Sequence, residues 1–483
     1  MTDKKIRMMS VLVAFLLMFT FNIGYAGPEM LRDEIVGTVL DVDSLGRKVI
    51  DNSVGESDVP IVETEVDTTE NVVEGTSESA IGATADVVIL NNEGVELLES
   101  YSFTQPEGMD VENIEYNQYN IGYFYVVAVS NAVNVRQKPD TSSPVVKQLG
   151  FYGKMNVFEK VRGQHFTKSD SDEWYRVYWY EKSEIKTGYV YSKIVNFRTF
   201  RLDLVKTQID ELVDYFSKYD NMAQISNYKN VNGYAPLYKG KKEDAFGNTR
   251  DQSAPLYQSA DSSSELRYLP DGLVVDVLGA ENGYYKVHVF DHGSEGYVPK
   301  KYLSFQNQVE EMNQVIFVDI KNQNISSYQL TEGQWVLKSL SYATTGVEAQ
   351  FKEPTVPGTY AAIQKKEKFL YLDDKTKELD GYAPYAIRFN GGAYLHGFPV
   401  NYRWNKVQEL VKSAEYDAQG VLLHEAVYSE KRVGSPIDPG LIEYSYTLGT
   451  VPLSHKCVRN PTSHAEFLYD WIVLNEAMIV VVD

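Results

Sequence analysis

The sequence predicts a mainly β chain, in which two small β-barrels precede a larger β-rich domain. Short apolar runs broken by Gly, Asp and Asn turns dominate from residue 117 to the end. Two of these stretches repeat the same order of motifs, which predicts two copies of one fold. Tyrosine is frequent, with 36 of 483 residues, and aromatic side chains favour strands. We expect several hydrophobic cores and few helices.

The first 26 residues have the features of an export signal. Lys4, Lys5 and Arg7 precede an apolar run over residues 8–23, and Gly24-Tyr25-Ala26 resembles a cleavage site. A retained N-terminal membrane anchor is the alternative. In both cases we expect an extracytoplasmic protein, in the cell wall or on the outer face of the cytoplasmic membrane.

Residues 27–116 carry most of the negative charge of the chain. They contain 22 acidic and 3 basic residues, out of a net charge of −21 for the whole chain. So little apolar surface cannot offset the entropy cost of folding, which predicts a disordered acidic spacer. An acidic interaction tail is the alternative. The rest of the chain is close to neutral and has no basic stripe, so we expect no nucleic-acid partner.

The internal repeat spans residues 117–199 and 231–306. Both copies contain a serine-rich turn, an aromatic pair before a cation and a valine, and a final Gly-Tyr-Val. These motifs are Trp174-Tyr175-Arg176-Val177 and Gly188-Tyr189-Val190 in the first copy, and Tyr284-Tyr285-Lys286-Val287 and Gly296-Tyr297-Val298 in the second. Between the copies, residues 200–230 include an amphipathic segment from Leu202 to Phe216, which predicts a connector helix.

The block over residues 313–483 is predicted to be mostly β with one or two helices. Predicted strands are 316–320, 325–328, 336–342, 359–363, 385–389, 393–396 and 477–482, and a helix is predicted over 462–474. Asn390-Gly391-Gly392 predicts a tight hairpin turn just before His396.

Cys457 is the single cysteine of the chain. It is therefore an inert buried thiol, a reactive thiol or an intermolecular bridge. Cationic Lys456 and Arg459 flank it, and positive charge stabilises the nucleophilic thiolate. His455 shares its face if the segment is extended. We therefore expect a reactive thiol.

Thiol chemistry needs a base that removes the sulfur proton. His396 is the favoured candidate because it follows the Gly-rich turn, and His424 is the alternative base. His464 is expected to be structural. Only 26 residues follow Cys457, which disagrees with the papain-like order of cysteine well before histidine. The histidine spacing does not match a metal site, and no metal is expected.

These residues carry a resemblance to known families. Residues 313–483 resemble the catalytic domain of the L,D-transpeptidases, the YkuD-like family, in Thr344-Thr345-Gly346, Pro357-Gly358-Thr359-Tyr360, Tyr394-Leu395-His396-Gly397 and the Ser454 to Arg459 motif. The two repeats resemble bacterial SH3-type wall-binding domains, although a spacer module without a ligand is the alternative.

The resemblance implies a role for each motif residue. Cys457 is the nucleophile, His396 the general base, and the Gly397 carbonyl orients its imidazole. His455 shapes the pocket, the amides of Lys456 and Cys457 form the oxyanion hole, and Arg459 braces the Ser454-containing loop or meets a substrate carboxylate.

The resemblance further implies a function. The substrates are peptidoglycan stem peptides, joined as 3→3 cross-links through a cysteine thioester, with no cofactor. We expect a monomer. An L,D-carboxypeptidase and a non-catalytic wall-binding protein with a degenerate catalytic domain are the alternatives.

Two features depart from the family pattern. Lys456 stands where the family usually has glycine, which strains the backbone if φ is positive there. In addition, 57 residues separate His396 from Ser454, where the family has some 15. The excess predicts an insertion at 400–445 that forms a lid or substrate wall.

Overall fold

The computed structural model describes residues 94–483, except 307 and 374–376. The predicted export signal and most of the predicted spacer lie outside these residues. The described chain is mainly β, as predicted, and its two α-helices are α3 (Leu202–Lys218) and α4 (Thr462–Trp471). No described helix is long and apolar enough to cross a membrane.

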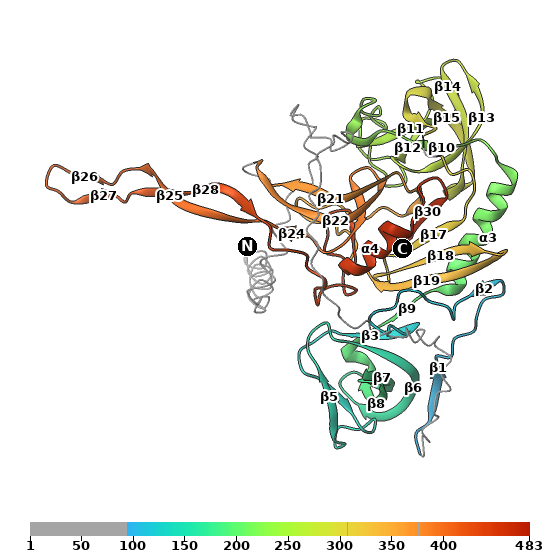
Figure 1. Cartoon of the computed structure of the whole chain (residues 1–483), viewed down its shortest axis with the longest axis vertical. Coiled ribbons are helices and arrows are strands. Elements are labelled where there is room, and N and C mark those ends of the chain that lie inside the picture. Colours follow the sequence, from blue (N-terminus) through green and yellow to red (C-terminus); the bar gives the residue numbers. More distant parts are fainter. Residues whose placement is uncertain (1–93, 307, 374–376) are drawn as a thin grey trace, which may run out of the picture.

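The first module is a strongly curled antiparallel sheet with the strand order β5-β4-β8-β7-β6-β3-β9 (Figure 1). Its strands are β3 (Phe124–Ala128), β4 (Val133–Arg136), β5 (Val145–Leu149), β6 (Lys154–Phe166), β7 (Ser171–Glu181), β8 (Glu184–Tyr191) and β9 (Val195–Thr199). Strand β1 (Leu97–Ser100) adds to the edge of β6.

The second module has the order β12-β11-β15-β14-β13-β10-β16, which matches the first module position by position. Its strands are β10 (Met222–Ile225), β11 (Ser253–Tyr257), β12 (Leu266–Pro270), β13 (Val274–Glu281), β14 (Tyr284–Val289), β15 (Ser294–Pro299) and β16 (Leu303–Ser304). The two modules differ between their first two strands, where residues 129–132 of the first correspond to 226–252 of the second. The predicted repeat is therefore present as a repeat of topology.

The C-terminal domain packs a six-stranded sheet, β2-β19-β18-β17-β30-β20, near a smaller one, β21-β22-β23-β29. The strands are β2 (Met109–Asp110), β17 (Gln314–Asp319), β18 (Asn324–Thr331), β19 (Gln334–Tyr342), β20 (Gly358–Ala361), β21 (Gln364–Leu372), β22 (Leu379–Asn390), β23 (Ala393–His396), β24 (Val400–Asn401), β29 (Val458–Arg459) and β30 (Ala477–Val482). Helix α4 lies against β22 and β23. The predicted strand 393–396 and the strand 477–482 have the expected bounds.

The modules share their cores with this domain. One continuous cluster joins Leu273 and Val275 of the second module to Tyr360 and Phe389 of the C-terminal domain. A second cluster joins α3 to the first module and to the large sheet. Apolar burial therefore fixes both modules against the C-terminal domain.

The prediction of a disordered spacer up to residue 116 is wrong at its C-terminal end. Strand β1 pairs with β6, and β2 pairs with β19. Met109 and Val111 alternate into the core and are buried. Phe103 and Ile114 pack against the same core. These apolar contacts, together with backbone pairing, order this acidic stretch.

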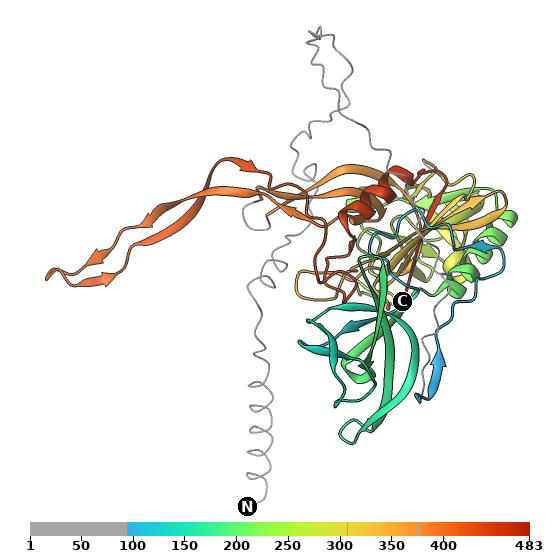
Figure 2. The same cartoon turned by 60° about the horizontal axis from the view of Figure 1, so that its bottom comes forward.

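The predicted insertion is a long β-arm. It consists of β25 (Arg403–Lys412), β26 (Glu415–Tyr416), β27 (Leu422–His424) and β28 (Val427–Ile437), paired as two successive ribbons. The arm projects from the body in both views, with β26 and β27 at its far end (Figures 1 and 2). Most of its side chains are exposed.

Candidate active site

Cys457 lies just before β29 and is 3% exposed. It packs in a small cluster with Phe369, Ala383, Ala386 and Tyr394. Its thiol points to the carbonyl oxygen of Gly392, at a sulfur–oxygen distance of 3.8 Å. The backbone N–H of Tyr394 donates to the sulfur. The hairpin turn and the first residues of β23 therefore supply the two groups that bond to the thiol.

His396 is the last residue of β23, and strand pairing brings it to the nucleophile loop. Strands β23 and β29 run parallel, with His396 opposite Arg459. The ring Nδ1 lies 2.6 Å from the carbonyl oxygen of Gly397. A carbonyl only accepts, so Nδ1 carries the proton and Nε2 keeps a free lone pair, as a general base requires.

Cys457 and His396 line the same small hollow. Its other walls come from Phe369, Tyr371, Ala383, Pro399, Ser454, His455 and Arg459. The enclosed volume is about 20 Å³, the space of one water-sized group. The structure therefore brings together Cys457, His396, His455, Ser454 and Arg459.

Burial dominates the electrostatics of this pair. It raises the pKa of the Cys457 thiol to about 11, against the smaller lowering effects of the Tyr394 amide, Arg459 and Lys456. Burial also lowers the pKa of His396 to about 4. Thiol and imidazole are both neutral at pH 7. Arg459 and Lys456 lower the thiol pKa, as expected of flanking cations, but desolvation outweighs them, and the reactivity of the thiol stays a prediction.

The charge of Lys456 is also compensated. Its Nζ lies 3.0 Å from the Glu353 carboxylate, and the two side chains are 11% and 53% exposed. The Lys456 backbone has a φ of +63°, the left-handed conformation that favours glycine. The strain foreseen for lysine at this position is thus present in the structure.

Three contacts hold this left-handed residue. The Lys456 N–H donates to the Glu353 carbonyl at 2.7 Å, and the Thr355 hydroxyl donates to the Lys456 carbonyl at 2.9 Å. Gly346 passes so close that a Cβ there would lie 2.6 Å from the Lys456 nitrogen. Residues 346–355 therefore form a cradle for the nucleophile loop.

The expected oxyanion donors are occupied. The Lys456 N–H bonds to Glu353, and the Cys457 N–H donates to the His455 carbonyl at 2.7 Å. Both amides therefore have partners within this structure, and the oxyanion hole stays a prediction. The Cys457 sulfur itself accepts a hydrogen bond from the Tyr394 backbone N–H.

The remaining motif residues brace the loop. The buried Ser454 hydroxyl donates to the Cys457 carbonyl. The backbone of Arg459 exchanges hydrogen bonds with Thr344, and its side chain is buried beside the hollow. Gly397 has no room for a side chain, because a Cβ would lie 2.8 Å from the Thr462 hydroxyl.

Two other histidines lie away from Cys457. His424 is exposed on β27 at the far end of the arm (Figure 1). The residues that line the hollow all lie outside 400–445, so among the described residues the arm forms neither a lid nor a wall. His464 is buried in α4, with Nε2 3.0 Å from the Ser339 hydroxyl, and burial lowers its pKa to about 3.

The sequence reasoning missed Glu353, Thr355 and the hydrogen-bonding roles of Gly392 and Tyr394. Glu353 and Thr355 lie some 100 residues before the nucleophile and belong to no recognisable motif. Gly392 was found only as part of a turn. The Gly391-Gly392 pair could have indicated this role, because the absence of side chains lets a backbone carbonyl approach the sulfur.

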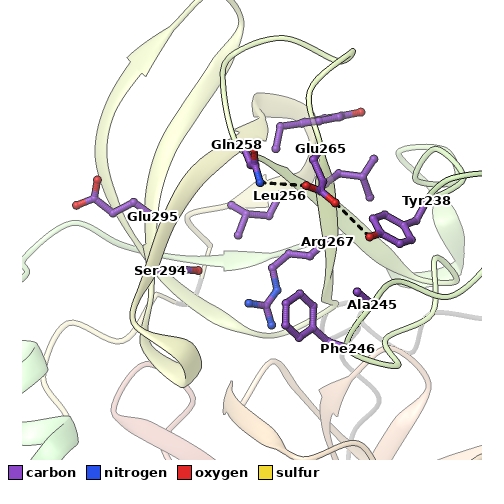
Figure 3. Close-up of a pocket in the computed structure, with 11 residues that line it drawn as sticks. Tyr238, Ala245, Phe246, Leu256, Gln258, Glu265, Arg267, Ser294 and Glu295 are labelled. Carbon is purple, nitrogen blue, oxygen red and sulfur yellow. Dashed lines mark hydrogen bonds between the residues drawn. The ribbon is translucent and has the colours of Figure 1, made fainter.

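A second hollow, of about 340 Å³, lies on the second module (Figure 3). The guanidinium of Arg267 stacks on Phe246 at 3.9 Å, and its Nε is buried without a hydrogen-bond partner among the described residues. Glu265, two residues before Arg267, accepts hydrogen bonds from Tyr238 and Gln258. Tyr238 and Phe246 come from residues 226–252, so the hollow depends on the segment that distinguishes this module.

Comparison with known families assigns the larger domain. Residues 313–482 match the model of the L,D-transpeptidase catalytic domain, YkuD. The chain carries an L,D-transpeptidase catalytic domain. Residues 131–196 match the bacterial SH3 domain. That model matches the first module alone, so the resemblance of the second rests on its shared strand order.

Solved structures show only distant likeness. A fused Zn-dependent amidase/peptidase/peptidoglycan-binding protein from Clostridium acetobutylicum is 15% identical, with 35% of this chain and 52% of that chain covered and a TM-score of 0.21. An L,D-transpeptidase from Mycobacterium smegmatis is 14% identical over 48% and 79%, with a TM-score of 0.23. L,D-transpeptidase 3 from Mycobacterium tuberculosis is 13% identical over 45% and 71%, with a TM-score of 0.22. This chain thus spans about half of the first of these structures. No curated protein matches the sequence.

Proposed function

We propose that this L,D-transpeptidase uses Cys457 as its nucleophile and His396 as its base to cross-link peptidoglycan stem peptides. The observation that supports the proposal is that both line one hollow, with His396 at the end of β23 and Cys457 just before the parallel strand β29. The hydrogen bond from Nδ1 to Gly397 supports the role of His396, because it leaves Nε2 unprotonated.

The neutral state of both groups defines the first step. Nε2 takes the thiol proton while the sulfur attacks the carbonyl carbon of the third stem residue, since no thiolate is formed beforehand. A C–S bond forms and the carbonyl becomes a tetrahedral oxyanion. An amide of the nucleophile loop receives this oxyanion only after its present bond to Glu353 or His455 opens.

Collapse of the intermediate breaks the C–N bond to the terminal D-alanine. The imidazolium of His396 gives its proton to the leaving amine, and a thioester remains on Cys457. The side-chain amine of a second stem then attacks the thioester and passes a proton back through His396. A 3→3 cross-link forms and the thiol is regenerated. Arg459, buried beside the hollow, is placed to meet a stem carboxylate.

We infer that the modules keep the enzyme at the wall. The first module matches the bacterial SH3 domain. The hollow of the second module presents the Arg267 guanidinium and aromatic faces, whereas its carboxylates Glu265 and Glu295 are paired with Lys239 and Lys286. The guanidinium and the rings suit a short peptide that bears a carboxylate. Weaker sedimentation with purified wall sacculi for Arg267→Gln, with catalysis unchanged, is the expected result. Equal sedimentation of variant and native protein rejects this site.

The catalytic proposal is tested with a tetrapeptide stem and mass spectrometry. The native protein should release D-alanine and form a tripeptide-linked dimer, whereas Cys457→Ala should form neither. His396→Gln should lower the rate by about 100-fold or more, because it removes the base. An active, correctly folded Cys457→Ala variant would reject the nucleophile.

A second candidate is a wall-binding protein without catalysis. The buried neutral thiol and the two occupied loop amides favour it. A folded native protein that binds sacculi but releases no D-alanine establishes this reading. Release of D-alanine without dimers, in the presence of an acceptor stem, establishes an L,D-carboxypeptidase instead.

A further inference from the structure

The second module contacts the catalytic domain through a buried acid. Asp271, in the turn between β12 and β13, is 1% exposed. Its Oδ2 accepts hydrogen bonds from Arg388 Nη1 at 2.8 Å and from the Gly391 backbone N–H at 3.0 Å. Its Oδ1 accepts the Asn227 N–H at 2.6 Å. One carboxylate therefore links the module to β22 and to the turn of the β22–β23 hairpin.

Further contacts fix the same hairpin. Gly272 has a φ of +85°, and a Cβ there would lie 1.9 Å from the Phe389 carbonyl oxygen. The Arg388 guanidinium also stacks over the Tyr228 ring at 4.6 Å, and Tyr228 belongs to the second module's 226–252 segment. The module thus encloses residues 388–391 with backbone, charge and aromatic contacts.

This hairpin carries the groups that bond to the nucleophile. Gly392 accepts the Cys457 thiol, and Tyr394 donates to its sulfur. His396 ends the same strand two residues further on. A shift of the hairpin moves both thiol partners and the base together, because they lie on one short strand.

The first module has no equivalent acid. Its corresponding turn, between β5 and β6, is Gly150-Phe151-Tyr152-Gly153. The contacts that hold the β22–β23 hairpin are therefore specific to the second module, although the two modules share one strand order.

We propose that the second module is a positioning part of the catalytic unit, in which Asp271 holds the hairpin that places Gly392, Tyr394 and His396 around Cys457. Asp271 touches no reacting atom and acts through Arg388 and Gly391. The expected effect of Asp271 on turnover rests on the proposed function. Its expected effect on the accessibility of the Cys457 thiol does not, because no substrate is involved.

The first test is alkylation of Cys457, the single thiol of the chain, by iodoacetamide at pH 8, followed by intact mass. The native thiol is buried and bonded to Gly392, so it should react slowly. Asp271→Asn should raise the alkylation rate by roughly tenfold, because local opening of the hairpin uncovers the sulfur.

Asp291→Asn is the matched control. Asp291 is an acid of the same module, and its Oδ2 accepts the Thr359 N–H of β20 at 3.1 Å. This substitution weakens the same interface away from the hairpin. Its alkylation rate should stay within about twofold of the native rate, as for a site that opens independently. Equal acceleration in both variants, or none in Asp271→Asn, overturns the proposal.

The second test is the turnover of a tetrapeptide stem. Asp271→Asn should lower kcat by about 10- to 100-fold with little change in KM, the result expected of a misplaced base. Faster alkylation and slower turnover at an unchanged Tm indicate a displaced hairpin, whereas the same results with a markedly lower Tm indicate unfolding of the domain.

Arg388→Lys provides a milder variant in case Asp271→Asn fails to fold. It keeps a cation near Asp271 but loses the planar stack on Tyr228, and intermediate effects are expected. A native alkylation rate in a folded Arg388→Lys variant overturns the proposal that Asp271 holds the hairpin through Arg388. If the native enzyme does not process stems, the proposed function fails, whereas the alkylation results still decide the role of Asp271.

Discussion

The most informative single residue is Cys457, whose surroundings differ from those of a preformed thiolate. Reactive cysteines commonly lie in partly exposed, electropositive sites. This thiol is buried among aromatic and small apolar side chains, and its cationic neighbour Lys456 is paired with Glu353. The proposed mechanism therefore depends on proton transfer to His396 during attack.

This difference predicts the pH dependence of alkylation. Because burial raises the pKa of Cys457 to about 11, the iodoacetamide rate should increase about tenfold per pH unit from pH 6 to 10, without a plateau. Stopped alkylation with intact-mass detection measures this profile. A plateau that begins near pH 7 would instead indicate a stable thiolate–imidazolium pair.

Lys456 gives a prediction about backbone strain. Its φ of +63° suits glycine and disfavours any residue with a Cβ. Lys456→Gly and Lys456→Ala both remove the ion pair to Glu353, so their comparison isolates the backbone. The glycine variant should be more stable than the alanine variant by about 1 kcal/mol. Urea unfolding of the two variants measures the difference, and equal midpoints would exclude strain at this position.

Residue-level prediction from the sequence succeeded where a motif is local. A single cysteine beside a histidine, and a histidine after Asn390-Gly391-Gly392, indicated two residues that the fold brings together. Glu353, Thr355 and Asp271 could not be found in this way, because each acts across more than 100 residues through a single side chain or carbonyl. The pKa of the Cys457 thiol could not be predicted from the sequence either, because it depends on burial, which the neighbouring charged residues do not reveal.

At the scale of elements, the β-arm is the feature that most separates this domain from the expected pattern. Its base is anchored, since Arg432 pairs with Asp380 at 2.8 Å and stacks over Trp404 at 5.4 Å. Its outer half has exposed side chains on both strands. The outer half therefore adds little to the stability of the body.

Deletion of the arm tip tests this view. Replacing residues 413–426 by Asn-Gly closes the ribbon between the paired Lys412 and Val427. We expect a Tm within about 2 °C of the native value, because surface changes of this kind cost little. Cys457 should still be acylated. The deletion removes only His424, which lies far from Cys457, and it retains His396, the proposed base. Loss of acylation in a folded deletion variant would make the arm part of the active site.

Elements were predicted well where alternation and turn residues agreed. The strands 393–396 and 477–482 have the predicted bounds, and the connector helix extends to Lys218, two residues beyond the predicted Phe216. The order of segment 94–116 was not predicted, because its composition is acidic and its core contacts come from few side chains. These are Phe103, Met109, Val111 and Ile114, with Tyr101 against the first module. Composition averaged over 90 residues concealed them.

At the scale of the whole molecule, the two modules and the catalytic domain form a continuous body. Leu273 of the second module and Tyr360 of the catalytic domain share a core and a β-bridge. Sequence repeats indicated separate barrels joined by a helix. Docking between them could not be predicted, because it rests on tertiary contacts of otherwise ordinary side chains.

Buried histidines predict acid sensitivity of this body. Burial lowers the pKa of His396 to about 4 and that of His464 to about 3, from an ordinary value near 6.5. Their contribution to stability is complete above pH 6.5 and is lost as pH falls towards 4, because only the unfolded chain binds protons in that range. For each histidine, the free energy of unfolding should fall by about 1.4 kcal/mol for every unit by which the pH is lowered between pH 6 and 4.

His464→Gln isolates one of the two contributions. Glutamine does not titrate and is able to hydrogen-bond to Ser339. The slope of unfolding free energy against pH should decrease by about 1.4 kcal/mol per unit relative to the native protein. Urea unfolding at pH 4.5, 5.5 and 6.5 measures both slopes, and identical slopes would refute a neutral buried His464.

The most direct measurement of the central claim is the intact mass and peptide map of the protein after incubation with a tetrapeptide stem or a carbapenem, without an acceptor. We predict one covalent acyl adduct, located on Cys457, absent from Cys457→Ala and formed about 100-fold more slowly in His396→Gln. A folded native protein that gains no mass, or that carries the adduct on another residue, would contradict the account.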